Sequence, residues 1–356
     1  MTITKHLTWV AAGLLALTAC AGPTASAPSP STPAALTESS TLTVVTHDSF
    51  GLSKPLLEKF KSDTGYTVTM VAPGDAGTVL NQLVLTKDSP IGDVVFGIDN
   101  TFAGRALSQG VVAPYTPATL PASAADLQAD ASGRLTPIDF GDVCLNADKE
   151  WFAAKKLALP ATLEDLLKPE YADLLVVENP ASSSPGLAFL AATVAAKGEA
   201  GYLEYWKALK ANGVKVAKGW TEAYTVDFSG SAGKGPRPLV VSYATSPSAE
   251  VPEGSDESRT TSLLATCFRQ VEYAGVISGA QNEVGARKFI DFLLSDAVQA
   301  DIPGQMYMYP ANRTISLPPE WAQFAPLADQ PWALSTELIA SQRDTWIRAW
   351  TSTVIG

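Results

Sequence analysis

The sequence predicts an α/β fold of two lobes, each a mainly parallel sheet flanked by helices, with two crossover strands between them. The first observation is an alternation of strands and helices with short links, which is typical of parallel sheets covered by helices. The second is length, because the segment 41–356 is too long for one simple core. The third is a pair of strand-like segments, 136–145 and 270–276, that would cross between the lobes.

The first lobe is predicted to open with three strands. We expect these strands at 41–46, 66–71 and 93–99, with helices at 53–64 and 78–85 between them. Ser53 precedes the first helix as a suitable N-cap. The third strand is apolar through its middle, which indicates burial on both faces. In such sheets ligands bind beyond the carboxyl ends of the strands. The polar residues that the sequence places there are His47, Asp48, Asp75, Asp99 and Asn100.

The second lobe is predicted to be inserted between the two crossover strands. We expect its elements at 163–167, 174–178, 187 onward, 202–210, 214–218 and 238–243. An amphipathic helix at 283–294 and a closing helix at 336–350 follow the return to the first lobe. The predicted domains are therefore 41–139 plus 271–316 for the first lobe, 140–270 for the second, and 317–356 for a C-terminal helical segment packing on both.

The N-terminal residues 1–19 have the features of a secretion signal. Lys5 and His6 precede an apolar run, 7–17, that is too short to span a bilayer. The run ends in Leu17-Thr18-Ala19-Cys20, the pattern of a bacterial lipoprotein box. We expect acylation of Cys20 and a tether to the outer face of the cytoplasmic membrane; the alternative is an ordinary signal with an incidental cysteine. Residues 20–40 are rich in Pro, Ser, Thr and Ala and predict a disordered spacer.

The charge of the chain limits its partners. The sequence has 25 Lys and Arg against 36 Asp and Glu, a formal net charge of −11. Since no basic patch stands out, nucleic acid and anionic membrane surfaces are poor partners. An acidic surface suits small cations better.

The two cysteines of the folded part, Cys144 and Cys267, suggest one disulfide in an exported, oxidising setting. The alternative is two separate buried thiols. Both cysteines lie near the predicted crossovers, which makes a bridge across the hinge plausible. Two cysteines are too few for a typical zinc site, so a metal-dependent enzyme lacks its ligands. His47 is the single histidine after the leader, so histidine-based catalysis has only this one candidate base.

A tryptophan follows directly on a predicted strand end. The strand at 214–218 leads into Gly219, Trp220 and, four residues on, Tyr224. A tryptophan on a glycine hinge can show its face to a ligand, and aromatic faces attract organic cations. The alternative is that Trp220 is an aromatic of the core or of an interface.

Two further segments place polar groups at strand or helix ends. Ser182, Ser183 and Ser184 precede Pro185 and Gly186 at a helix start, an arrangement that can accept a phosphate but can equally be a well-capped helix. Residues 243–247, Tyr-Ala-Thr-Ser-Pro, likewise place polar groups at the end of a predicted strand. The loop at 304–310 offers two alternating tyrosines, for which turn packing is the plain alternative.

An enzyme is not what the sequence predicts. No Gly-x-Ser-x-Gly elbow, Gly-rich phosphate loop or metal-ligand spacing is present. A catalytic carboxylate pair stays open, because such pairs have no sequence signature. We therefore expect a binding protein without a cofactor or a metal.

Several of these runs resemble thiamine-binding solute receptors of ABC importers. The resemblance covers nearly all of 41–356 and is most specific at 218–224 (Lys-Gly-Trp-Thr-Glu-Ala-Tyr) and at 242–247 (Ser-Tyr-Ala-Thr-Ser-Pro). It extends to the runs at 44–50, 92–100 and 183–186. The resemblance implies the type II fold of periplasmic binding proteins. It also implies thiamine or its phosphate esters as ligand, a permease as partner, no cofactor and a monomeric receptor.

The resemblance also implies a set of ligand-binding positions. They are a carboxylate-bearing turn, a serine pair for a phosphate end, a stacking ring and a contact loop. In this sequence they fall on Asp75, Ala76, Ser183, Ser184, Trp220, Tyr224, Tyr243, Ala244, Thr245, Ser246, Tyr307 and His47. The chain departs from the family pattern at Ala76 (Gly), His47 (Tyr), Ala249 (Tyr) and Tyr307 (Trp), so its aromatic cage is thinner.

Two other functions stay open on the sequence alone. One is a receptor for another cation, such as a polyamine or ferric iron. A polyamine receptor would need more carboxylates in the cleft. An iron receptor usually has adjacent tyrosines as ligands, and Tyr307 and Tyr309 are a weak substitute for such a pair. The other is a secreted hydrolase that uses carboxylates.

Overall fold

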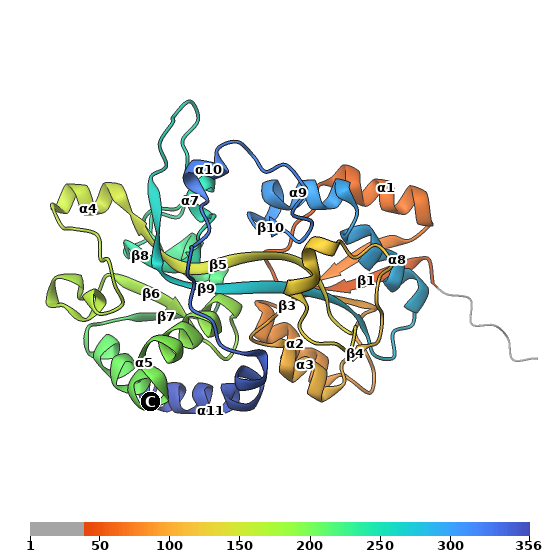
Figure 1. Ribbon diagram of the computed structural model, residues 1–356, viewed down its shortest axis with the longest axis horizontal. Helices are drawn as coiled ribbons and strands as arrows, with labels where there is room; N and C mark the ends of the chain where they lie inside the picture. The colour runs from red at the N-terminus through yellow and green to blue at the C-terminus, as the bar shows by residue number, and fades with distance from the viewer. Residues whose placement is uncertain (1–38) are drawn as a thin grey trace, which may run out of the picture. The chain divides into compact units, whose positions relative to one another are not determined.

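The computed structural model describes residues 39–356, which form one compact unit (Figure 1). The predicted signal, Cys20 and nearly all of the predicted spacer lie outside the described residues. Within the described part of the chain, no helix has the length and apolar character needed to cross a membrane.

A single mixed sheet organises the fold. Its main path runs β2-β1-β3-β9-β5-β8-β6-β7, with β4 added to β9 and β10 added to β5. The strands are β1 (Thr41–Val45), β2 (Thr67–Val71), β3 (Val94–Asp99), β4 (Val112–Ala113), β5 (Thr136–Asp148), β6 (Leu175–Glu178), β7 (Lys215–Ala217), β8 (Leu239–Tyr243), β9 (Thr260–Ile277) and β10 (Tyr309–Pro310).

The sheet has a parallel group at each end and an antiparallel pair between them. Strands β2, β1 and β3 run parallel, as do β8, β6 and β7. The long strands β5 and β9 pair with each other along most of their length and connect the two groups. We refer to the β1–β3 group with its helices as the first lobe and to the β6–β8 group as the second. The two crossover strands are thus present, although the two sheets are continuous rather than separate.

Helices cover both faces of the sheet. Figure 1 shows α2, α3, α5 and α11 on one side and α1, α8 and α9 on the other. The helices are α1 (Lys54–Thr64), α2 (Ala76–Leu85), α3 (Ala103–Gln109), α4 (Lys149–Lys155), α5 (Ser184–Ala211), α6 (Trp220–Glu222), α7 (Ser246–Ala249), α8 (Glu283–Leu293), α9 (Asp296–Met306), α10 (Trp321–Phe324) and α11 (Thr336–Val354). Helix α11 packs against both α3 and α5.

Burial on both sides explains the apolar strands of the first lobe. Val45 and Val95 point to the cluster under α2 and α3, whereas Val44 and Val94 point to the cluster under α8 and α9. Because side chains alternate along a strand, a strand between two cores must be apolar at every position. Strand β3 is buried at all of its residues, as its sequence indicated.

Two helices were expected in the segment 187–210, and both are present. They follow each other in α5 (Ser184–Ala211), which is broken at Gly198, where the backbone is not helical and φ is 69°. Glycine adopts a positive φ readily, so the chain kinks there between the first helix and the second. At the start of α5 the Ser183 side chain accepts a hydrogen bond from Gly186 N–H, as expected for an N-cap.

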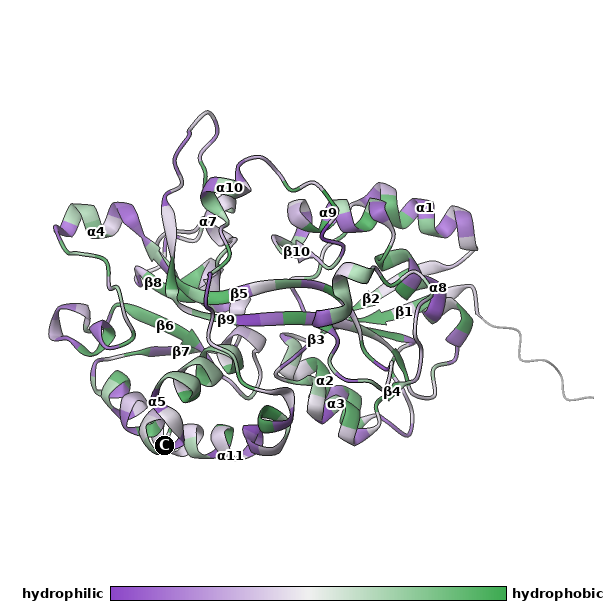
Figure 2. Cartoon of the chain, in the orientation of Figure 1, coloured by the Kyte–Doolittle hydropathy of each residue, from purple (hydrophilic) through white to green (hydrophobic). Residues whose placement is uncertain are grey.

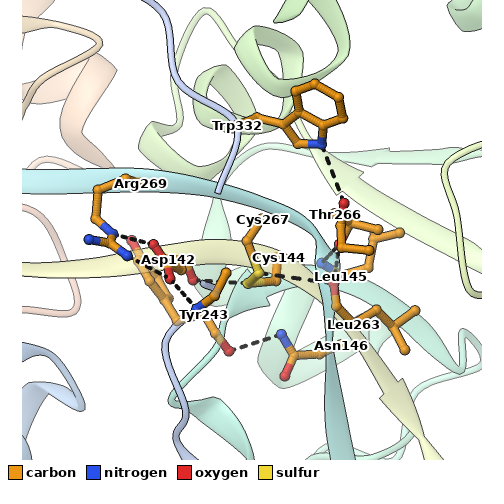
Figure 3. Close-up of a disulfide and its surroundings, with 12 residues drawn as sticks. Asp142, Cys144, Leu145, Asn146, Tyr243, Leu263, Thr266, Cys267, Arg269 and Trp332 are labelled. Carbon is orange, nitrogen blue, oxygen red and sulfur yellow. Dashed lines mark hydrogen bonds and ion pairs between the residues drawn. A yellow bond between two sulfur atoms is a disulfide. The ribbon is translucent and has the colours of Figure 1, made fainter. Parts of the chain in front are cut away.

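A disulfide joins the two crossover strands at a bulge (Figure 3). Cys144 of β5 bonds Cys267 of β9, with their Cα atoms 4.1 Å apart. The β5–β9 register shifts at this point, because Val143 faces Phe268 while Leu145 faces Leu263. The bulge in β9 is therefore held by a covalent bond to the neighbouring strand.

Candidate functional site

An aromatic-lined cavity of about 250 Å³ lies between residues of the two lobes. We call it the aromatic cavity. The first lobe contributes the loop after β1 and the end of α9, while the second contributes α6, β8 and α7. Its lining consists of His47, Ser49, Trp220, Tyr224, Tyr243, Thr245, Ser246, Ala249, Glu272, Gln305, Met306, Tyr307 and Met308.

Trp220 is held in one orientation at the wall of this cavity. Its backbone N–H donates to Asp75 Oδ2 at 3.0 Å, and its indole Nε1 donates to Ser242 Oγ at 2.8 Å. One indole face stacks on Tyr224, with centroids 5.0 Å apart and planes 15° apart. Since Tyr224 covers one face, the other face is left to line the cavity. The strand-to-helix change predicted here is present, because β7 ends at Ala217 and α6 begins at Trp220.

Two more tyrosines complete the aromatic wall. Tyr243 meets Trp220 edge to face, with centroids 6.4 Å apart and planes 62° apart. Burial, followed by the charge of Glu272, raises the pKa of Tyr243 well above its usual value, so its phenol is neutral. Tyr307 ends α9 in a left-handed conformation (φ 56°) and is 37% exposed. Tyr307 therefore covers the outer side of the cavity.

The polar wall of the cavity is formed by His47 and Glu272. The atoms His47 Nε2 and Glu272 Oε1 are 3.6 Å apart, and His47 Nδ1 lies 3.0 Å from Ser49 Oγ. Burial lowers the pKa of His47, but the charges of Glu272, Asp75 and Asp48 outweigh it and raise the pKa above the ordinary value. These acidic surroundings favour the protonated form of His47.

Further carboxyl groups lie behind this pair. Asp139 faces Glu272 across the β5–β9 ladder. Burial and the charge of Glu272 raise the pKa of Asp139 well above its usual value, so Asp139 is a neutral acid. Burial also raises the pKa of Asp99 to about 6, although hydrogen bonds from Ser184 and Thr101 oppose the shift. Figure 2 shows the matching hydrophilic stretch in the middle of β9.

Asp75 acts as a link between the lobes in this structure. Its Oδ1 accepts from Ala76 N–H at 2.7 Å, which caps α2, and from Ser184 N–H at 3.2 Å. Its Oδ2 accepts from Trp220 N–H. All three donors are backbone groups, and Asp75 does not line the aromatic cavity.

Four other expected site residues also lie outside the aromatic cavity. Ala76 is buried in the first turn of α2, and Ala244 is buried beside the disulfide. Ser183 and Ser184 are buried at the start of α5. The hydroxyl of Ser184 donates to Asp99 and accepts from Gln270 Nε2 at 2.9 Å. A ligand contact by these four residues is still a prediction from sequence.

A second, polar cavity of about 620 Å³ adjoins the first. We call it the polar cavity; its lining includes Asp48, Asp75, Ser182, Lys218 and Glu222. Asp48 lies between His47 and Ser49 in the chain, and Lys218 lies two residues before Trp220, so the two cavities are neighbours. Hydrogen bonds across the cleft, such as Gly77 N–H to the Ser182 carbonyl at 3.0 Å, show that the lobes are closed on each other.

Sequence reasoning missed part of the cavity lining. Glu272 was seen only as part of a crossover strand, although a charged residue inside an apolar strand is itself a signal. Gln305, Met306 and Met308 stand in the loop that was singled out for its tyrosines. Nothing in the sequence shows that α9 turns these side chains toward β8.

One protein-family model matches this chain. The model of the bacterial extracellular solute-binding proteins matches residues 89–330. The chain therefore belongs to this family.

Relatives that match over nearly the full chain carry one name. A protein named thiamine-binding periplasmic protein from Brucella suis biovar 1 (strain 1330) is 29% identical over 321 residues, which are 87% of this chain and 91% of the relative. A protein of the same name from Escherichia coli (strain K12) is 29% identical over 315 residues, with 87% and 92% covered.

Solved structures agree on the fold. A structure described as a periplasmic thiamin binding protein superposes with a TM-score of 0.76 at 27% identity and covers 88% of this chain and 96% of its own. The apo ferric ion-binding protein A of Pasteurella haemolytica superposes with a TM-score of 0.67 at 16% identity, covering 89% and 98%, which shows the fold alone. The two-lobe, type II fold of periplasmic binding proteins predicted from the sequence is thus confirmed.

Proposed function

We propose that this protein captures thiamine, or one of its phosphate esters, outside the cytoplasm and delivers it to the permease of an ABC importer. The observation that carries the proposal is the aromatic cavity, whose lining combines the rings of Trp220, Tyr243 and Tyr307 with the carboxylate of Glu272. The names of the relatives that match this chain support the same ligand.

The cavity suits the two rings of thiamine. Its thiazolium ring is permanently cationic and its aminopyrimidine is flat, so both fit between aromatic faces. Each cation–π contact with Trp220 or a tyrosine contributes about 0.5–2 kcal/mol. The flexible side chains of Met306 and Met308 adapt to the ligand's outline. No Lys or Arg stands among the residues that line this cavity, so no fixed positive charge repels the thiazolium ring.

The hydroxyethyl end of thiamine, or its phosphates, would extend into the polar cavity. Lys218 and Ser182 line that cavity and supply a cation and a hydroxyl. Ser183 and Ser184 begin the long helix α5 next to Ser182. A phosphate placed there would also benefit from the N-terminal end of the helix dipole.

Closure of the lobes would bury the ligand and create the form that a permease recognises. The hydrogen bonds of Asp75 to the second lobe are contacts that opening must break. Opening and closing about a few hinge residues is the usual motion of this architecture. We propose further that the receptor is monomeric and held at the membrane by a lipid on Cys20.

A metal receptor is less well supported than a receptor for an organic cation. Across residues 39–356, no group of three or more His, Cys, Asp or Glu side chains is arranged to hold a metal ion. Tyr307 and Tyr309 do not stand together, because Tyr309 packs on Phe140 and Trp321 rather than lining the aromatic cavity.

Mass spectrometry of ligand that co-purifies with the native protein tests the proposal directly. We expect thiamine or a phosphate ester, released unmodified on denaturation. Recovery of a polyamine, or of thiamine cleaved during incubation, would contradict it, since the first names another ligand and the second shows catalysis.

A further inference from the structure

His47 and Glu272 face each other in the wall of the aromatic cavity. His47 follows β1 of the first lobe and Glu272 lies in the crossover strand β9. Both side chains are buried and line the cavity. The 3.6 Å between Nε2 and Oε1 is longer than a hydrogen bond, and Nε2 has no hydrogen-bond partner among the described residues. A buried donor without a partner is costly and needs a reason.

The structure makes room for this histidine. Gly97 of β3 has a φ of 89° and stands at the register shift between β3 and β9. A Cβ atom at this position would overlap the His47 ring. Phe96 also packs against His47, with ring centroids 5.6 Å apart. The bulge at Gly97 thus seats the imidazole where Nε2 points to Glu272.

The surroundings of the pair are strongly acidic. The charged and titratable groups that face it are Asp48 after β1, Asp75 at the start of α2, Asp99 at the end of β3, Asp139 of β5 and Tyr243 of β8. Asp139 and Tyr243 are neutral, as argued above. Among the described residues that line the cavity, His47 is therefore the side chain whose protonated form offsets Glu272.

We propose that Glu272 selects a cationic ligand for this cavity and that His47 is its competitor, so that a ligand cation replaces the proton of His47. This inference rests on the proposed function. A buried carboxylate needs a positive partner. In the empty cavity His47 supplies it, and in the complex the thiazolium ring does. Two cations beside one carboxylate repel each other, so binding expels the proton.

The consequence is a defined dependence on pH. Below the pKa of His47 the proton competes with the ligand, and above it Glu272 is free to attract the cation. Because the acidic neighbours raise this pKa above its ordinary value, affinity for a cation rises with pH through the neutral range and then levels off. The affinity for a neutral ligand of the same shape does not follow this curve.

Isothermal titration calorimetry on the native protein tests the inference with two ligands. They are thiamine and its neutral carbon isostere, in which a thiophene replaces the thiazolium ring. Between about pH 6 and about pH 8.5, we expect thiamine affinity to rise about tenfold and the isostere to stay level. Titrations in two buffers of different ionisation enthalpy should show net proton release with thiamine near neutral pH. Absence of proton release would overturn the inference without any variant.

Two variants separate the roles. Glu272→Gln removes the charge at nearly constant shape, and we expect the preference for thiamine over the isostere to fall about tenfold or more. His47→Gln is neutral at every pH, and we expect the pH dependence to vanish while the preference for the cation persists. Glu283→Gln, the same change on the exposed face of α8, is the matched control and should behave as the native protein.

The outcomes distinguish this inference from the proposed function. Equal binding of thiamine and the isostere at every pH, or a Glu272→Gln variant that keeps the full preference, would overturn the inference and leave thiamine binding intact. Binding of neither compound by the native protein would overturn the proposed function and the inference with it.

Discussion

Trp220 is positioned by contacts on three sides, and each has a different origin. Its backbone is fixed by Asp75 of the first lobe, its indole nitrogen by Ser242 of β8, and one ring face by Tyr224. The contacts with Ser242 and Tyr224 lie within the second lobe and do not depend on closure, so they orient the ring before a ligand arrives, which lowers the entropy cost of binding. We therefore propose that recognition depends on one oriented indole face and on one carboxylate of the same cavity, Glu272.

The substitution Trp220→Ala tests the role of this face. We expect thiamine affinity to fall by more than about tenfold, because one cation–π contact and its buried apolar area are lost. The midpoint of thermal unfolding should change little, since the ring is only half-buried. Fluorescence of the remaining tryptophans or calorimetry measures the affinity.

Trp332→Ala is the matched control, because Trp332 is 37% exposed and packs near the disulfide rather than in the cavity. Unchanged affinity in Trp220→Ala, or an equal loss in Trp332→Ala, would show that the indole at position 220 does not contact the ligand.

Most helices and strands could be predicted from the sequence, because short patterns within one segment decide the type of element. The strand β3 and the start of α5 follow from an apolar run and from a Ser-Ser-Pro-Gly cap. Helix α9 was missed because Pro303 and Gly304 inside it are typical of loops. The first half of β9 was missed because its bulge breaks the alternation on which strand prediction depends.

The candidate site was predictable where one segment supplies both the residue and its surroundings. Trp220 and Tyr224 belong to a single run, and their stacking follows from helical spacing. The opposition of His47 and Glu272 depends on strands β1 and β9, which are more than 200 residues apart in the sequence and meet only through the sheet order. Which carboxylate would face the ligand was therefore not decidable: Asp48, Asp75 and Asp99 were all expected at the strand ends, and the resemblance implied a ligand contact for Asp75 alone.

Asp75→Ala tests whether this residue links two elements rather than contacts the ligand. Loss of the α2 cap should cost about 1 kcal/mol of the free energy of unfolding. Loss of the bonds to Ser184 and Trp220 should also weaken ligand binding severalfold, because the closed state loses two contacts. Chemical denaturation and calorimetry measure the two effects.

The cap of α11 provides the control. Ser335 accepts from Leu338 N–H at 3.2 Å at a helix start outside both cavities. Ser335→Ala should cost a similar free energy of unfolding without changing affinity. If both variants lose only stability, the link between the lobes made by Asp75 has no part in binding.

The whole molecule depends on the two crossover strands, because they carry the lobes and the disulfide lies between them. Cys144 and Cys267 are 123 residues apart in sequence, so their bond closes a long loop in the unfolded chain. We expect the double variant Cys144→Ala/Cys267→Ala to lose about 2–4 kcal/mol of the free energy of unfolding. Urea denaturation measures it.

A reductant supplies the internal control for the disulfide. Denaturation of the native protein with reductant present should show the same loss, while the double variant should not respond to reductant. A native protein that unfolds at the same urea concentration with and without reductant would show that the bond does not stabilise the fold.

The buried acids give the empty receptor a dependence of stability on pH. The pKa values of Asp99, Asp139, Glu178 and His47 are all raised in the folded state, by burial for the acids and by neighbouring carboxylates for His47. A group with a raised pKa stabilises the fold below its unfolded pKa and loses that contribution as pH rises through the folded value. Stability should therefore fall from about pH 5 to about pH 8.

Thermal unfolding of ligand-free protein across this range measures the effect. Asp99→Asn should flatten the curve in its lower part, because the pKa of Asp99 is about 6. A midpoint that rises steadily toward pH 8 would contradict the protonation states assigned to the cavity.

Calorimetric titration of ligand-stripped native protein with thiamine decides whether the aromatic cavity binds this ligand. We expect saturable binding of one thiamine per chain with a dissociation constant of about 1 μM or tighter. Absence of binding heat and of any thermal stabilisation at about 1 mM thiamine would contradict it.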